Sequence, residues 1–176
     1  IVWLADVLDR DQRSPVIQGP HVPVQVLRVL GASADWWMRA DAAGSANAPL
    51  DLLSALASHE DRVVRAAVAG NPNTPDDALR RLSTDPDADV RAGVAANTSG
   101  SPVVGVLLRT LASDTNEHVR GAVAGNPRAP LDLYAQLVPL LVNSNDWWTR
   151  QQVARNPATP VDLLRTLADD SQSDVV

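Results

Sequence analysis

Residues 61–75 read DRVVRAAVAGNPNTP, and this stretch returns in weaker form along the whole chain. Its arginine recurs at successive spacings of 26, 26, 26, 29 and 30 residues. The six arginines in this position are Arg13, Arg39, Arg65, Arg91, Arg120 and Arg150. A period of this length is typical of tandem repeats, in which each unit buries its apolar surface only against its neighbours. We therefore predict a solenoid that has no globular centre.

The first half of each repeat is predicted to be a short helix. In the repeat that begins at Asp61, Val64 and Val68 lie four residues apart and give this helix one apolar stripe. Asn71 and Pro72 are expected to end it, because proline pushes the preceding residue out of the helical region and asparagine accepts the unusual backbone of a helix end. The same structural role is predicted for the asparagines that recur in this position, Asn71, Asn97, Asn126 and Asn156.

The second half of each repeat is predicted to be a second helix. Thr74 is its expected side-chain cap, with Pro75 at the first helical position. An acid follows at the third position, and we assign it a capping role as well. This acid recurs as Asp51, Asp77, Asp132 and Asp162, with Gln25 in the first repeat. Leucines at helical spacing follow and are expected to form a continuous core: Leu52, Leu53 and Leu56; Leu79 and Leu82; Leu163, Leu164 and Leu167.

The predicted boundaries divide the chain into six repeats. These are 9–34, 35–60, 61–86, 87–114, 115–144 and 145–170, with residues 1–8 ending a preceding repeat and 171–176 starting another. The extra residues of 87–114 are expected in the turn NTSGSPVVG, and those of 115–144 are expected to lengthen the second helix, which Pro139 kinks. The chain starts without methionine and ends in SDVV, which resembles DRVV, so we expect a piece of a longer array.

Composition narrows the classes of partner and chemistry. The chain has 15 basic residues, all arginine, against 21 acidic residues, and its net charge of −6 disfavours nucleic acid as a partner. Cysteine is absent, which excludes disulfides, thiolate metal sites and cysteine nucleophiles. No apolar run approaches the roughly 18 residues of a membrane span, and the opening IVWLADVL lacks a basic leader. We predict a cytoplasmic protein with no membrane association.

Written out as VRxxVAxNPxTPxxxLxxLAxD, the repeat resembles the bacterial leucine-rich repeat variant family over about residues 9–170. The resemblance is clearest at Arg150, Val153-Ala154, Asn156-Pro157, Thr159-Pro160, Leu163, Leu164 and Leu167. It implies an all-α fold: a right-handed α-solenoid of about six repeats, close to HEAT-type solenoids, in which short α or 3₁₀ helices alternate with α-helices and no sheet forms. Some members carry a cysteine-ligated iron–sulfur module, which a chain without cysteine cannot hold. The first two repeats depart from the pattern at Gly19-Pro20, Ser45-Ala46 and Asp41.

The recurring arginines are predicted to be structural. An acid precedes most of them by four residues, which places acid and base on one helix face. The pairs are Asp9–Arg13, Asp35–Arg39, Asp61–Arg65, Asp87–Arg91 and Asp146–Arg150. The alternative is that the arginines form an anion-binding ladder, with one guanidinium from each repeat.

Two tryptophan pairs, Trp36-Trp37 and Trp147-Trp148, occupy the same position in their repeats. Other repeats hold mostly polar residues there, among them Arg62, Asp89 and Glu117, so we expect at least one tryptophan of each pair to be exposed. Tryptophan is a common anchor of binding interfaces. The candidate partner-binding residues are Trp36, Trp37, Trp147, Trp148 and His118. The alternative is that the indoles only cover an irregular neighbouring repeat.

Motifs for catalysis or metal binding are weak in this chain. Residues 85–89, DPDAD, imitate the start of a calcium loop, but Val90 and Ala96 stand where the loop requires glycine and glutamate. His21, His59 and His118 are expected to be isolated surface residues. No serine lies in an elbow motif and no glycine-rich phosphate loop is present. We therefore predict no enzymatic activity, no metal and no cofactor.

Three functions remain as hypotheses. The first is a non-catalytic interaction or scaffold module that grips a protein or peptide partner, or a second copy through open terminal repeats. The second is a helical-repeat protein that binds nucleic acid, by analogy with helical-repeat DNA glycosylases, although the charge of the chain disfavours it. The third is a structural spacer within a larger protein.

Overall fold

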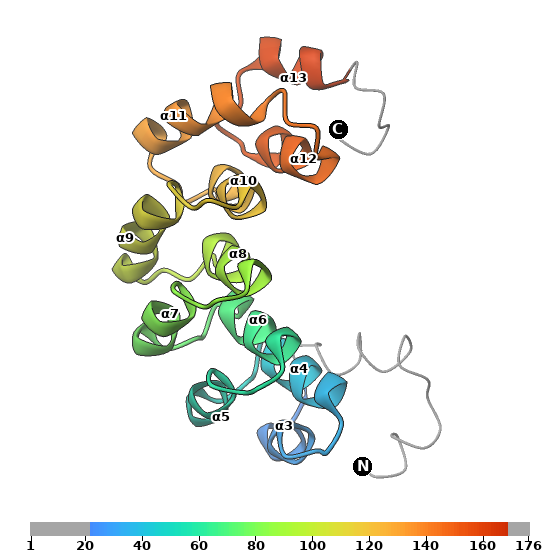
Figure 1. Cartoon of the computed structure of the whole chain (residues 1–176). Helices are drawn as coiled ribbons and strands as arrows, with labels where there is room; N and C mark the ends of the chain where they lie inside the picture. Colours follow the sequence, from blue (N-terminus) through green and yellow to red (C-terminus); the bar gives the residue numbers. More distant parts are fainter. Residues whose placement is uncertain (1–21, 169–176) are drawn as a thin grey trace.

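The computed structural model describes residues 22–168, and within them the chain forms eleven helices and no strand. The helices alternate between two layers of an arc (Figure 1). The inner layer contains α4 (Trp36–Gly44), α6 (Arg62–Gly70), α8 (Ala88–Ala96), α10 (Glu117–Gly125) and α12 (Trp147–Arg155). The outer layer contains α3 (Val24–Gly31), α5 (Leu50–Leu56), α7 (Asp76–Leu82), α9 (Pro102–Leu111), α11 (Leu131–Leu141) and α13 (Val161–Ala168).

The expected all-α solenoid is confirmed, and every helix in the described part is an α-helix rather than a 3₁₀ helix. Arg13, His21 and the Gly19-Pro20 turn lie outside the described residues, as do the predicted segments 1–8 and 171–176. Within residues 22–168, every helix falls short of the length and apolarity that crossing a bilayer requires.

The arc bends toward the inner layer because the inner helices pack more closely than the outer ones. Each inner helix packs directly against the next, whereas outer helices touch one another far less. Small residues permit this approach: a Cβ added at Gly93 would lie 2.9 Å from the Cβ of Ala69 and 3.0 Å from the carbonyl oxygen of Ala66. A Cβ at Gly121 would similarly lie 3.1 Å from Oγ1 of Thr149. Since side chains at the contact set the interhelical distance, alanine and glycine here produce the concave face.

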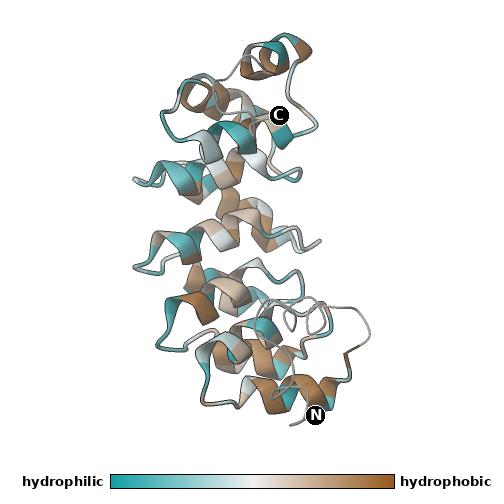
Figure 2. Cartoon of the chain, turned by 90° about the vertical axis from the view of Figure 1, so that its right-hand side faces the viewer, coloured by the Kyte–Doolittle hydropathy of each residue, from teal (hydrophilic) through white to brown (hydrophobic). Residues whose placement is uncertain are grey.

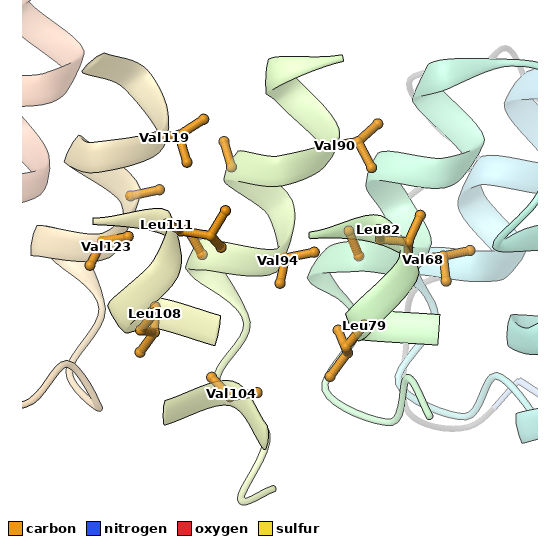
Figure 3. Packing of buried hydrophobic residues seen from close by; sticks show 14 of the residues in the cluster. Val68, Leu79, Leu82, Val90, Val94, Val104, Leu108, Leu111, Val119 and Val123 are labelled. Carbon is orange, nitrogen blue, oxygen red and sulfur yellow. The ribbon is translucent and has the colours of Figure 1, made fainter. Parts of the chain in front are cut away.

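The hydrophobic core is a continuous band between the two layers. Inner helices contribute pairs of valines four residues apart, such as Val64 and Val68. Outer helices contribute leucines such as Leu79 and Leu82 (Figure 3). All four of these side chains are buried, as the predicted stripes require. The band runs without interruption from Ala43 to Leu167, so each repeat covers the apolar side of its neighbour.

Buried asparagines tie consecutive repeats together. Nδ2 of Asn97 donates to the carbonyl oxygens of Ala69 and Asn71 in the preceding repeat, at 2.7 and 2.8 Å. Its Oδ1 accepts the N–H of Ser99 at 2.8 Å. The same bonds to the preceding repeat recur at Asn71, Asn126 and Asn156. These residues end their helices in extended backbone, and no described residue has positive φ. The prediction that asparagine stands here because it accepts an unusual backbone conformation was therefore wrong. The position requires asparagine because its amide bonds to the preceding repeat.

The sequence suggested that Thr74 caps the second helix, but the structure shows that it does not. Its hydroxyl donates back to the carbonyl oxygen of Val68 at the end of α6, and α7 starts after Pro75 with no side-chain cap. Thr159 bonds to Val153 in the same way. A hydroxyl cap is present in one repeat, where Ser101 accepts the N–H of Val103 at 3.1 Å. The threonine thus closes the turn, because its hydroxyl gives the carbonyl of Val68 a second hydrogen bond beside that from the N–H of Asn71.

The longer repeats insert their extra residues into outer helices. Four residues, 98–101, separate Asn97 from α9, the same number as residues 72–75 between Asn71 and α7. Helix α9 has 10 residues, whereas α7 has 7. The expectation that the extra residues of this repeat fall in its turn was therefore wrong. Helix α11 has 11 residues with Pro139 inside it, so the predicted lengthening of that helix is confirmed.

Candidate functional site

The inner helices begin in a row along the array, and acids or amides cap most of these starts. Asp61 accepts the N–H of Val63 at 2.7 Å, and Asp87 accepts the N–H of Asp89 at 2.9 Å. Asn116 and Asp146 cap α10 and α12 in the same way. The predicted pairing with the arginine four residues later is wrong for Asp61 and Asp87, because each carboxylate binds the helix start while Arg65 and Arg91 bind Asp85 and Asp114. Asp9 and Arg13 lie outside the described residues.

The arginines of the central repeats reach into the following repeat. Nε and Nη2 of Arg65 donate to the two carboxylate oxygens of Asp85, at 2.7 and 3.0 Å. Nη1 of Arg65 also donates to the carbonyl oxygens of His59 and Glu60, at 2.9 and 2.8 Å. The side chains of Arg65 and Asp85 are only 15% and 8% exposed. One guanidinium therefore joins the loop before its own helix to the loop before the next helix.

Arg91 repeats this arrangement with Asp114, at 2.7 and 3.0 Å. We call the pairs Arg65–Asp85 and Arg91–Asp114 the arginine clamps. The hydrogen bonds from Arg91 hold the pKa of Asp114 below its usual value, against the opposing effect of burial. At Asp85, burial alone would raise the pKa, but the bonds from Arg65 and from the N–H of Asp87 outweigh it and the pKa is lowered. Both clamps thus favour the ionised carboxylate.

Arg39 and Arg120 keep only part of the clamp. Arg39, Arg120 and Arg150 each donate Nη1 to the carbonyl oxygen six residues earlier, on Ser33, Asp114 and Ser144. The residue that matches Asp85 is His59 in one neighbouring repeat and Ser144 in another. Nε of Arg39 is buried with no hydrogen-bond partner among the described residues. The anion-ladder alternative gains no support, because all five described guanidinium groups are half-buried and bound to loop carbonyls.

The tryptophans lie at the starts of α4 and α12. Trp36 is 36% exposed and Trp147 is 43% exposed, whereas Trp37 and Trp148 are partly buried. The expectation that at least one indole of each pair is exposed is confirmed. Both pairs lie at the starts of inner helices, which form the layer on the concave side of the arc (Figure 1). Figure 2 views the array from this side, with hydrophilic loops along one edge.

The sequence suggested that His118 is isolated, but in the structure it has neighbours. Its ring stacks on the indole of Trp148, with centroids 3.6 Å apart and planes 19° apart. Its Nδ1 lies 3.9 Å from Oδ2 of Asp146. Nδ1 of His59 also has a partner, since it accepts the N–H of Asp61 at 3.0 Å. Both described histidines therefore hold structural contacts, and His118 covers one face of Trp148.

Two hollows open beside Trp36. The smaller, of about 300 Å³, is lined by Trp36, Trp37, Ala40, Asp41, Gly44, Val63 and Ala67. The larger, of about 530 Å³, is lined by Trp36, Glu60, Asp61, Arg62, Val63, Arg65, Pro86 and Asp87. Trp36 and Val63 line both hollows and form the ridge between them. We call them the small hollow and the large hollow.

The acids of the DPDAD stretch each have a separate structural task. Asp85 belongs to a clamp, Asp87 caps α8, and Asp89 forms an ion pair with Arg62. In the part of the chain that the structure describes, no three His, Asp or Glu side chains gather as a metal site requires.

Comparisons with known proteins agree with the geometry. The model of the leucine rich repeat variant family matches residues 62–87 and 147–172. A solved structure described as a leucine-rich repeat variant with a novel repetitive structural motif is 25% identical, with a TM-score of 0.50. The match covers 98% of this chain and 76% of that chain. The resemblance to the leucine-rich repeat variant family is thus confirmed in two stretches of the chain and in its fold. No curated protein matches this chain.

Sequence reasoning missed the acid of each clamp. Asp85 follows Leu82 by three residues, and Asp114 follows Leu111 by three residues. That recurrence was visible, but a pairing over 20 or 23 residues cannot be read without knowing how the repeats stack. The four-residue spacing suggested that Asp61 pairs with Arg65, but the carboxylate of Asp61 caps the start of α6 instead.

Proposed function

We propose that this chain is a non-catalytic interaction module that binds a protein or peptide segment on its concave face. The exposed indoles of Trp36 and Trp147 carry the proposal. They lie at the starts of α4 and α12, with three inner helices between them. The residues at the corresponding positions of those three helices are mostly polar. Large exposed aromatic side chains are frequent anchors of protein interfaces.

The shape of the array supports this role. The inner layer presents an extended concave surface, which is how helical solenoids engage elongated partners (Figures 1 and 2). The hollows beside Trp36 give a bound segment places for side chains. A spacer would need neither feature. A nucleic-acid partner would need accessible cations, yet the recurring arginines are half-buried and the chain carries a net charge of −6.

The test is selection of peptide ligands from a displayed random library, followed by affinity measurement with variants. The first variant is Trp36→Ala with Trp147→Ala. Its matched control is Leu50→Ala with Leu131→Ala, which removes apolar side chains that are 61% and 72% exposed on the outer layer. Selected ligands should bind the tryptophan variant about 30-fold more weakly, because an aromatic hot spot contributes about 2 kcal/mol.

The control variant should keep wild-type affinity, and both variants should keep the helical circular dichroism of the parent. Equal loss of affinity in the two variants would place binding elsewhere than the concave tryptophans. Failure of the selection to return any tryptophan-dependent ligand would also reject the proposal.

A further inference from the structure

We infer that the two hollows around Trp36 bind a basic peptide segment, whose arginine or lysine side chain lies against the Trp36 indole in the large hollow. This inference rests on the proposed function, since it names the chemistry of the partner. Three observations carry it: the balance of charge in the large hollow, its aromatic wall, and the apolar character of the small hollow beside it.

The large hollow has an excess of negative charge. Two arginines line it, but each already has an acid outside the lining: Arg65 binds Asp85 and Arg62 binds Asp89. Arg62 also lies 3.8 Å from Asp87, so five acids in or beside the hollow stand against these two arginines and leave an excess of three negative charges: Glu60, Asp61, Asp85, Asp87 and Asp89. Because these carboxylates converge on one concavity, they attract a cation and repel phosphate.

Two of these acids are held in place by the fold. Oδ1 of Asp61 accepts the N–H of Val63, and Oδ1 of Asp87 accepts the N–H of Asp89. Each carboxylate is therefore fixed at the start of an inner helix and pays little further ordering on binding a ligand. Oδ2 of Asp87 lies 3.8 Å from Nε of Arg62, whose Nη1 binds Asp89.

Trp36 gives the large hollow an aromatic wall. An arginine or lysine cation is attracted to the face of an indole, and its alkyl stem packs on the same apolar surface. On the other side of Trp36, the small hollow is walled by Trp37, Val63 and Ala67, and it holds one acid, Asp41. A linear segment with a basic residue followed by an apolar residue matches the two hollows, because the large hollow is acidic and the small hollow is mostly apolar.

A control variant comes from the outer layer. Leu131 is 72% exposed at the start of α11 and lines neither hollow. Leu131→Ala therefore removes an exposed apolar side chain without changing the hollows at α4 and α6.

The experiment uses the full chain and three fluorescein-labelled peptides in anisotropy titrations. One peptide alternates arginine with leucine, the second replaces arginine by lysine, and the third replaces it by glutamate. The arginine and lysine peptides should bind, and raising the salt concentration should weaken both because screening shortens the reach of the carboxylates. Binding of the glutamate peptide with equal affinity would overturn the inference.

Variants locate the site. Asp61→Asn with Asp87→Asn removes two charges and keeps the helix caps, because asparagine caps as well as aspartate does. This variant and Trp36→Ala should each weaken the arginine peptide by about tenfold or more. Leu131→Ala should leave its affinity unchanged. Wild-type affinity in the asparagine variant would overturn the inference, and unchanged melting temperature there shows that folding is intact.

The outcome separates this inference from the proposed function. If the basic peptides fail to bind while library ligands of another composition still depend on Trp36, the concave face is a binding surface for a different chemistry and the inference is wrong. If no ligand of any composition depends on Trp36 or Trp147, the proposed function itself is wrong.

Discussion

The central joints of the array differ from the joints on either side of them. Between the repeats of α6, α8 and α10, the clamps Arg65–Asp85 and Arg91–Asp114 join one repeat to the next through two charged hydrogen bonds each. At Arg39 and Arg120 the guanidinium holds its own loop, but the matching positions are His59 and Ser144.

The difference separates two tasks of one arginine. Its bond to the carbonyl six residues earlier recurs in every described repeat, so it shapes the loop that starts the inner helix. The bond to the next repeat depends on a single residue, three places after the last leucine of the outer helix. Since stability in a repeat array is a sum of units and interfaces, the clamp tunes one interface at a time.

The largest effect is expected from Arg91→Ala, which breaks a central clamp. It leaves the carboxylate of Asp114, which is 9% exposed, without its cation, and removing one partner of a buried pair costs about 3–5 kcal/mol. The matched variant is Arg120→Ala in a joint without an acid. It should cost about 1–2 kcal/mol, since only bonds to the carbonyls of Asp114 and Thr115 are lost.

Urea denaturation followed by circular dichroism gives the free energy of unfolding for both variants. Equal losses in Arg91→Ala and Arg120→Ala would show that the clamps add nothing to the loop bonds, and the contrast between the joints would disappear.

The next effect is a loss of clamp stability in acid. Because the pKa of Asp114 in the folded chain lies below its ordinary value of 3.8, the clamp's contribution is fully present above that pH. As the pH falls below 3.8, the unfolded chain takes up the proton first, so stability drops until the folded carboxylate is protonated as well.

The comparison of wild type with Asp114→Asn isolates this group from the other acids. Their difference in free energy of unfolding should be constant near neutral pH and should shrink below pH 3.8. A difference that stayed constant into strong acid would mean that Asp114 is not ionised in the clamp.

Much of the fold could be predicted from the sequence because it is local and repeated. The valine and leucine stripes have helical spacing, and the break at Asn71-Pro72 has a steric cause, so helix pairs and their boundaries follow from a single repeat. The curvature could not be predicted in this way. It depends on how closely Gly93 approaches Ala69 across a joint, and no spacing within one repeat records that distance.

The candidate site was predictable in one respect only. A tryptophan at a polar helix start indicates exposure, and Trp36 and Trp147 are exposed. The hollows were not predictable, because Glu60 and Asp87 come from different repeats and meet beside Trp36 only after stacking. The same limit applies to His118, whose contact with Trp148 crosses from one repeat to the next.

A smaller effect, with the opposite sign, is expected from grafting a clamp onto a flanking joint. His59→Asp places a carboxylate where Asp85 stands in the following repeat, opposite the buried Nε of Arg39. The gain should be about 1–2 kcal/mol, because a hydrogen bond to a charged group contributes about 1.5–3 kcal/mol and burial of the carboxylate offsets part of it.

A double-mutant cycle with Arg39→Ala measures the new interaction directly. The coupling energy should be favourable and should vanish when His59→Asn replaces His59→Asp, since the amide carries no charge. If His59→Asp still stabilised the chain in the Arg39→Ala background, the gain would come from removing the histidine and not from a new clamp.

The smallest effect is expected from Asp132→Asn, which removes an ion pair between two outer helices. Nη1 of Arg109 on α9 lies 2.8 Å from Oδ2 of Asp132 on α11, and this pair spans 23 residues just as Arg91–Asp114 does. Its side chains are 56% and 58% exposed, however, so water solvates both charges when the pair is broken. The melting temperature should not change measurably. A loss comparable to that of Arg91→Ala would mean that sequence separation and geometry, rather than burial, give the clamps their strength.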